Sequence, residues 1–249
     1  MPAINPILDV YGVKVVSRYP KRKPSIKGEL LLYSFSSGEL LAFMDATWIT
    51  TKRTAAVATL AVKTLAKRNY KNIAIAGFGQ VGYSFVEMIT SLEGVKDKVF
   101  KLLEYKNQAS EMKKYLRELG VNNVEICHSN EDFIKNSDVI VSAVTVAREL
   151  FGNDEWYEKG VLVVPIHTRG FQNCDLFFDK VFADDTAHVS DFANFSKFKQ
   201  IDEFDKVIKN EIRGRSNDDE RILSYNIGIA LHDIFLAKKI YDNVISKSI

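Results

Sequence analysis

A glycine-rich segment at residues 77–82 is the part of the sequence that points most directly to chemistry. It reads Gly-Phe-Gly-Gln-Val-Gly, follows the apolar run Ile-Ala-Ile-Ala at 73–76, and opens a stretch with helical periodicity. A glycine loop between a strand and a helix suits the pyrophosphate of a dinucleotide, because the helix N-terminus offers N–H groups and a favourable dipole. An ordinary glycine-rich turn is the alternative.

Each glycine of this segment has a separate expected role. Gly77 permits the tight turn, Gly79 lets backbone amides approach the phosphates, and Gly82 lets the helix lie close to the strand. Gln80 and Val81 complete the loop, so we count them among the predicted cofactor-binding residues.

Glu104 is the second cofactor signal. It stands 22 positions after Gly82, at the end of the strand predicted for residues 99–103. An acidic residue at this place accepts hydrogen bonds from the adenosine ribose and favours NAD. Lys106 could instead meet the 2′-phosphate of NADP, and a solvated strand end is the alternative for Glu104. The sequence therefore predicts NAD or NADP, with NAD favoured.

Val144 and Thr145 end another predicted strand, at 138–145. Ligands of open α/β sheets bind at the carboxyl ends of the strands, where Thr145 can contact the nicotinamide ribose. A threonine that merely ends a strand is the alternative.

Alternating strands and helices surround these positions. Short apolar strands are expected at 73–76, 99–103, 124–127, 138–145, 161–166 and 181–183, with helices at 81–92, 110–119 and 130–136. This order predicts an α/β fold with a doubly wound parallel sheet covered on both faces, a Rossmann domain.

Both chain ends have a different pattern. We expect strands at 11–17, 29–35 and 39–45, the last two forming a hairpin, and then a helix capped by Thr50 or Thr51. Beyond residue 217 we expect a long helix with the apolar stripe Ile222, Leu223, Ile227, Ala230, Leu231, Ile234 and Phe235. The predicted domains are therefore 1–54 with 216–249, and 55–215.

Composition excludes several classes of protein. The chain has 249 residues, 34 Lys+Arg against 32 Asp+Glu, and 46% hydrophobic residues, which is ordinary globular composition. The small net charge favours neither nucleic acid nor an anionic membrane as partner. Two cysteines cannot form a disulfide framework, and no apolar run approaches the roughly 18 residues of a membrane span. No signal peptide is expected, so we predict a cytoplasmic protein.

Four stretches of the sequence resemble the ornithine cyclodeaminase/μ-crystallin family. They are residues 1–3 with 12–17, residues 38–56, the glycine segment, and residues 227–234. The second stretch is the most specific, because neither turn chemistry nor helix packing requires it. The resemblance implies an NAD(P)-binding domain joined to a smaller α+β domain for dimerisation and substrate binding, built from both chain ends.

The resemblance also implies a reaction. Members of the family act at the α-carbon of small amino or imino acids, oxidising an amine or reducing an imine, and cyclodeaminases convert ornithine to proline with loss of ammonia. Lys14 matches the family lysine near the substrate carboxylate, and Arg53 the arginine that grips it. A guanidinium can hold a carboxylate by two hydrogen bonds and orient the α-hydrogen. Thr54 would face the cofactor phosphates. Solvated surface positions are the alternatives for Lys14 and Arg53.

Two departures from the family pattern concern the substrate. Family chains commonly begin with a longer N-terminal arm, so we expect an N-terminally shortened member whose arm a separate chain could supply. Cyclodeaminases also carry an acid after the fifth strand, and Gln172 stands at its place. Because glutamine cannot take a proton, His167 or Asp175 could substitute as the catalytic group. Arg169 could be an added carboxylate binder.

The remaining candidates are weaker. Cys127 and Cys174 are expected to be buried small residues, and the histidines show no metal-ligand spacing, so no metal site is predicted. Asn226 corresponds to a small polar residue near the nicotinamide amide in family members. The predicted function is an NAD(P)-dependent enzyme of the ornithine cyclodeaminase type acting as a homodimer on a small amino or imino acid. A non-catalytic NAD(P)-binding dimer is the alternative.

Overall fold

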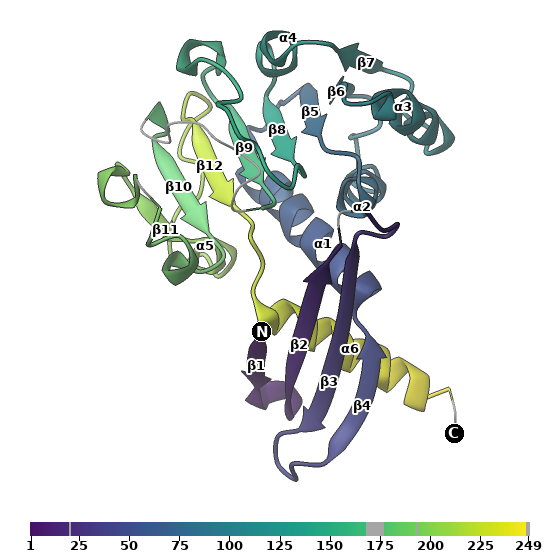
Figure 1. Ribbon diagram of the computed structural model, residues 1–249. Coiled ribbons are helices and arrows are strands. Elements are labelled where there is room, and N and C mark those ends of the chain that lie inside the picture. The colour runs from purple at the N-terminus through teal and green to yellow at the C-terminus, as the bar shows by residue number, and fades with distance from the viewer. Residues whose placement is uncertain (20, 168–176, 193, 248–249) are drawn as a thin grey trace. The chain divides into compact units, whose positions relative to one another are not determined.

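The computed structural model describes residues 1–19, 21–167, 177–192 and 194–247 (Figure 1). The chain forms two compact units, one made of Met1–Thr54 with Gly228–Ile249 and the other of Ala55–Ile227. The chain therefore returns to the smaller unit at residue 228, whereas the sequence predicted this boundary at residue 216.

The larger unit is built on a sheet of eight strands, and all pairs of neighbours are parallel. The strands are β5 (Asn72–Ala76), β6 (Val99–Leu103), β7 (Val124–Cys127), β8 (Val139–Ser142), β9 (Leu162–Pro165), β10 (Lys180–Ala183), β11 (Ile201–Glu203) and β12 (Ile222–Tyr225). Their order is β7-β6-β5-β8-β9-β12-β10-β11. The chain moves outward from β5 in one direction and from β8 in the other, so the switch point lies between these two strands.

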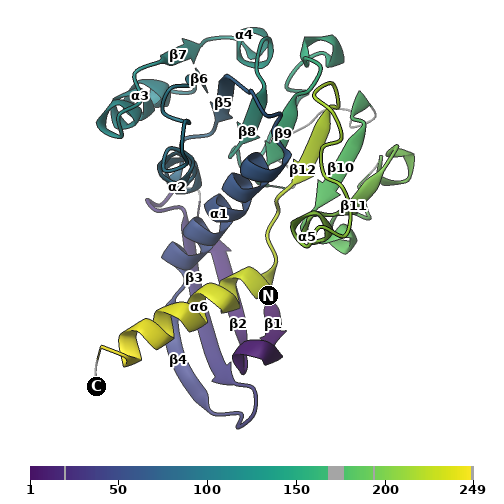
Figure 2. The same cartoon turned by 180° about the vertical axis from the view of Figure 1, so that it is seen from behind.

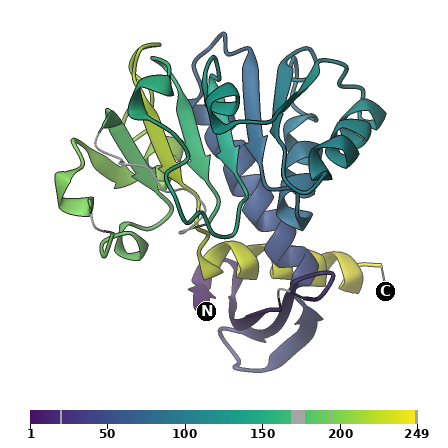
Figure 3. The same ribbon diagram turned by 45° about the horizontal axis from the view of Figure 1, so that its top comes forward.

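Helices cover both faces of this sheet, as Figure 3 shows from above. They are α1 (Thr47–Leu65), α2 (Gln80–Ile89), α3 (Gln108–Glu118), α4 (Asn130–Ile134) and α5 (Phe204–Ile208), with short 3-10 turns η2 (Asp154–Trp156), η4 (Thr186–His188) and η5 (Phe195–Lys197). The predicted α/β fold with a doubly wound parallel sheet and a separate smaller unit is confirmed.

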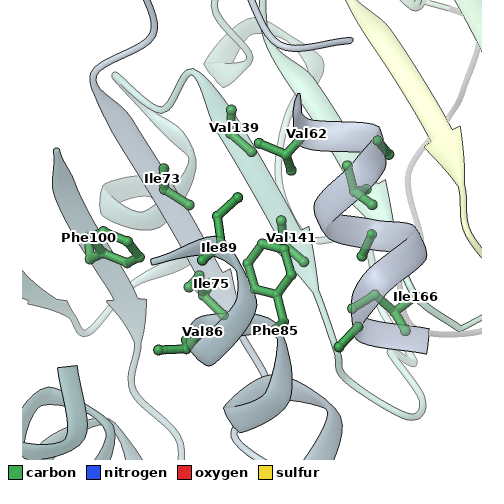
Figure 4. Packing of buried hydrophobic residues seen from close by; sticks show 14 of the residues in the cluster. Val62, Ile73, Ile75, Phe85, Val86, Ile89, Phe100, Val139, Val141 and Ile166 are labelled. Carbon is green, nitrogen blue, oxygen red and sulfur yellow. The ribbon is translucent and has the colours of Figure 1, made fainter. Parts of the chain in front are cut away.

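Alternation along β5 explains the two cores. Ile73 and Ile75 point to the face covered by α1, α2 and α3, while Ala74 and Ala76 point to the face that carries α4. Figure 4 shows Phe85 of α2 packed in the first of these cores. Because both faces of the sheet are covered at β5, its sequence is an uninterrupted run of hydrophobic residues, as is usual for buried parallel strands.

The smaller unit is an antiparallel sheet in the order β1-β2-β3-β4, with a helix against one face (Figure 2). Its elements are β1 (Pro2–Asn5), η1 (Pro6–Leu8), β2 (Val10–Arg18), β3 (Ile26–Ser34), β4 (Leu40–Asp45) and α6 (Ala230–Ile245). At Gly12 an ideal Cβ would lie 2.6 Å from Ile234 Cδ1, so the glycine lets α6 approach β2 closely.

Two expectations about secondary structure are wrong. Residues 222–225 form strand β12 instead of helix, because they pair with β9 and β10 inside the large sheet. Tertiary pairing thus overrides the helical spacing of apolar residues. Helix α1 begins at Thr47, whose N–H donates to the Asp45 carboxylate, so Thr50 and Thr51 lie within the helix and do not cap it.

Among the described residues, no helix combines the length and the hydropathy that crossing a membrane requires.

Candidate functional site

The glycine loop follows β5 at the switch point of the large sheet. Gly77 has φ +88°, and an ideal Cβ there would lie 2.6 Å from Val144 N. A Cβ on Gly82 would lie 2.2 Å from the Gly77 carbonyl oxygen. Both positions therefore require glycine, since the loop packs against the end of β8 and against the start of its own helix.

Gly79 differs from its two neighbours in the loop. An ideal Cβ at Gly79 meets no heavy atom of the described residues within 4 Å. Gly79 precedes α2, whose first turn contains Gln80 and Val81. The N–H groups of a first turn have no partner inside the helix, so they can bind an anion in the space beside Gly79.

Glu104 follows β6, the neighbour of β5. Its N–H donates to the Cys127 carbonyl, and its Oε1 is buried with no hydrogen-bond partner among the described residues. A buried carboxylate oxygen without a donor is costly, which indicates a place for a hydroxyl donor from a ligand. Lys106 has φ +51°, and its Nζ lies 5.0 Å from the centre of the Tyr105 ring.

Further predicted residues lie at the same edge of the large sheet, which we call the carboxyl edge. Val144 and the exposed Thr145 follow β8, and half-buried His167 follows β9. Asn226, 1% exposed, follows β12, and its side-chain amide donates to Asp184 Oδ1 over 3.2 Å. In the described part of the chain, Asn226 Oδ1 accepts no hydrogen bond.

A second site lies in the smaller unit, where three charged side chains form what we call the charged cluster. Lys14 Nζ lies 2.6 Å from Asp233 Oδ1, and Arg53 Nε donates to the same oxygen over 2.9 Å. Lys14 and Asp233 are fully buried and Arg53 is 8% exposed. Two cations share one carboxylate, so the buried cluster carries a net charge of +1.

This excess positive charge is costly in a buried place. Burial and the neighbouring Arg53 guanidinium lower the pKa of Lys14 to about 8, although the Asp233 carboxylate opposes them. Arg53 Nη1 and Asp233 Oδ2 are both buried without a hydrogen-bond partner among the described residues. An incoming anion would satisfy the guanidinium and neutralise the excess charge.

Local structure explains how the charged cluster forms. Strand alternation places Lys14 on the same face of β2 as Val10 and Gly12, the face that packs on α6. Asp233 lies in the first turn of α6 next to Ile234, which packs in this core. The prediction that Leu231 and Phe235 belong to a buried apolar stripe of the C-terminal helix is therefore wrong, because these side chains are 39% and 48% exposed.

The other predicted residues either make contacts outside the two sites or lie outside the described residues. The Thr54 hydroxyl donates to the Thr50 carbonyl over 2.6 Å, so its proton is engaged within the helix. Arg169, Gln172, Asp175 and Cys174 lie outside the described residues. Cys127 is buried, and burial raises the pKa of its thiol. No group of three or more His, Cys, Asp or Glu side chains that could hold a metal ion occurs in the described ranges.

Sequence reasoning missed Asp233 and Gly228 as site residues. An acidic residue on the same helix face as Ala230 and Ala237 was a usable signal, because buried acids are almost always paired. Gly228 has φ +87°, and an ideal Cβ there would lie 1.4 Å from Arg53 Nη1. That contact could not be inferred from the sequence.

The model of the ornithine cyclodeaminase/mu-crystallin family matches residues 1–248. The chain belongs to this family. The predicted family resemblance is confirmed, and it covers almost the whole chain.

Several relatives in the family are reductases or dehydrogenases. The Δ1-pyrroline-2-carboxylate reductase of Bacillus cereus is 26% identical over 100% of this chain and 82% of its own. The ketimine reductase mu-crystallin of Mus musculus is 34% identical over 64% of this chain and 50% of its own. A structure described as an archaeal alanine dehydrogenase dimer with bound NAD has a TM-score of 0.83 and 26% identity, covering 100% and 81% of the two chains.

Proposed function

We propose that this protein is an NAD(P)-dependent oxidoreductase that interconverts a small amino acid and its imino acid at the α-carbon. The observation that carries the proposal is the buried net positive charge of Lys14, Asp233 and Arg53. Such a cluster suits a carboxylate, the group that all α-amino and α-imino acids share. The reductases among the relatives support the direction of imine reduction.

Carboxylate binding would use both cations. Arg53 offers Nη1, which lacks a partner among the described residues, and Lys14 adds an ammonium beside the same Asp233 oxygen. Charge-assisted hydrogen bonds of this kind are short and directional, so they would orient the substrate as well as bind it.

Cofactor binding would use the carboxyl edge of the large sheet. The residues fit a dinucleotide: Gly79 leaves space for the pyrophosphate, and Glu104 Oε1 can accept from a ribose hydroxyl. Glu104 favours NAD over NADP, Thr145 suits the nicotinamide ribose, and Asn226 Oδ1 can accept from the nicotinamide amide. Bound reduced nicotinamide supplies a hydride to the substrate α-carbon. NAD also occurs in the archaeal relative.

Proton transfer to the imine nitrogen needs an acid. His167, half-buried after β9, remains our prediction for this role, and Asp175 is the alternative, because Gln172 at the position of the family acid cannot take a proton. Arg169 remains a predicted further carboxylate binder.

The deciding experiment follows absorbance at the reduced-nicotinamide band. The chain is mixed with NADH or NADPH and Δ1-pyrroline-2-carboxylate, and in the reverse direction with NAD⁺ or NADP⁺ and L-proline, L-alanine or L-ornithine. Turnover of the imino acid supports the proposal. Tight cofactor binding, measured by nicotinamide fluorescence, without turnover of any acid would overturn it and leave a non-catalytic NAD(P)-binding protein.

We also propose that the protein pairs with a second copy through the outer face of the small sheet. The register places Tyr11, Val13, Leu31, Tyr33 and Phe43 on the face opposite the charged cluster. Val13 and Phe43 are 38% and 66% exposed, and apolar patches of this kind mark interfaces. The alanine dehydrogenase relative is a dimer. Sedimentation should give a dimer that Phe43→Glu converts to monomer, while a monomeric parent chain would contradict the proposal.

A further inference from the structure

Asp233 brings together two cations that would otherwise repel. One of its oxygens lies 2.6 Å from Lys14 Nζ and 2.9 Å from Arg53 Nε. Lys14 comes from β2, Arg53 from α1 and Asp233 from α6, and among the described residues these two partners act on the pKa of Lys14 in opposite directions, the guanidinium lowering it and the carboxylate raising it. Because Asp233 takes the Nε side of the guanidinium, it determines which way the terminal nitrogens point.

Gly228 controls the space that the guanidinium occupies. An ideal Cβ at this position would lie 1.4 Å from Arg53 Nη1 and 2.6 Å from Cζ. The obstructed atoms belong to the far end of a flexible side chain, so an alanine at 228 would displace the guanidinium before it displaced the backbone.

We infer that Asp233 and Gly228 are positioning residues for substrate binding: Asp233 tethers Arg53 and Lys14 together, and Gly228 leaves the room in which Arg53 Nη1 can lie. The inference rests on the proposed function, in which these two cations receive the substrate carboxylate. Neither residue needs to touch the substrate, because each acts through Arg53.

Two substitutions and two matched controls test this inference. Gly228→Ala is compared with Gly38→Ala, since Gly38 also has positive φ, +76°, but its Cβ would meet nothing within 4 Å among the described residues. Asp233→Asn is compared with Asp242→Asn on the same helix, where the acid pairs with Lys238 at the surface. The first control makes the same Gly→Ala change at a positive φ, and the second makes the same Asp→Asn change in an ion pair, but neither residue contacts Arg53.

The expected results separate substrate binding from cofactor binding. Gly228→Ala should raise the KM for the imino acid by about tenfold or more, the usual scale for a charge-assisted hydrogen bond, and leave the KM for NADH unchanged. Gly38→Ala should leave both KM values unchanged. Asp233→Asn should raise the same KM and shift the alkaline limb of its pH profile to lower pH, because the lost carboxylate no longer favours the Lys14 ammonium. Asp233→Glu should restore part of the affinity.

A second readout keeps the inference testable if the wild-type chain turns over no substrate or if Asp233→Asn fails to fold. The Arg53 Nε–H resonance, assigned with Arg53→Lys, should change in Gly228→Ala and not in Gly38→Ala. Absence of wild-type turnover contradicts the proposed function alone. An unchanged Arg53 resonance, or an unchanged KM in an active Gly228→Ala enzyme, would overturn the positioning role.

Discussion

The glycine loop and the charged cluster offer different parts of the chain to a ligand. The loop presents backbone N–H groups from one short segment, residues 77–82, and its glycines serve by lacking side chains. The charged cluster presents side chains from β2, α1 and α6, and Arg53 and Asp233 are separated by 180 positions in the chain.

This difference affects stability as well as recognition. Backbone groups at a helix N-terminus exist in every helix, so the loop adds little cost to folding. The charged cluster buries two cations and one acid, and burial of an unbalanced charge is expensive. The proposed carboxylate site therefore has a folding cost that the loop does not have, and its residues should respond to mutation differently from those of the loop.

The largest expected effect sharpens the role of the charged cluster. Arg53→Ala should lower kcat/KM for the amino or imino acid by roughly 10²–10³-fold, because a charge-assisted contact that orients the substrate is lost. Lys14 and Asp233 would remain as a neutral pair, so the chain should fold. Steady-state kinetics and a cofactor titration check this, and activity equal to wild type would remove Arg53 from the site.

Gly79→Ala is the corresponding test of the glycine loop, with cofactor affinity as the measured quantity. At φ −83° an alanine is unstrained, and its Cβ meets no atom of the described residues, so stability without cofactor should not fall. The methyl group would occupy the space beside the helix N-terminus, and NADH affinity should drop by about tenfold or more.

Fluorescence titration and a thermal melt of the cofactor-free chain measure the two quantities. In contrast, Gly82→Ala should lose stability too, since its Cβ would clash with the Gly77 carbonyl. Undiminished NADH affinity in Gly79→Ala would exclude the loop as the phosphate site.

Lys14→Met tests whether the charged cluster costs stability. The pKa of Lys14 falls from 10.5 to about 8 on folding, so the unfolded chain binds this proton more tightly. The cost of folding is therefore complete below pH 8 and disappears as the pH rises toward 10.5. At pH 7, Lys14→Met should raise the free energy of unfolding by about 1–3 kcal/mol while weakening substrate binding.

Urea unfolding at several pH values between 7 and 10.5 measures this effect. Wild-type stability should gain relative to Lys14→Met as the pH rises through this window. A variant less stable than wild type at pH 7 would show that the lysine stabilises the fold.

Glu104→Gln should have the smallest effect. Under the proposed function, loss of the carboxylate should weaken binding of the adenosine ribose and remove repulsion of a 2′-phosphate. The preference for NADH over NADPH should fall by about tenfold, as measured by the ratio of the two dissociation constants. Lys106→Met is the companion variant, and a selective loss of NADPH affinity there would assign Lys106 to the 2′-phosphate.

The local spacing of apolar residues and glycines was sufficient to predict much of the large unit. The run 73–76, the glycine segment and Glu104 lie in continuous stretches whose apolar strands and turns are determined by near neighbours. Strand β12 was missed because its four residues, Ile-Leu-Ser-Tyr, lie within the segment predicted as helix and show no distinct strand period. Only pairing with β9 and β10 makes them a strand.

The sequence by itself determined the parallel sheet, the glycine loop and the candidate cations Lys14 and Arg53, because strand alternation, glycine spacing and family motifs are local properties. Only the tertiary structure decided that one oxygen of Asp233 holds both cations and that Gly228 leaves space for the Arg53 guanidinium. The physical reason is that the energy of a buried charge depends on what surrounds it in space, and here its partner arrives from the other end of the chain.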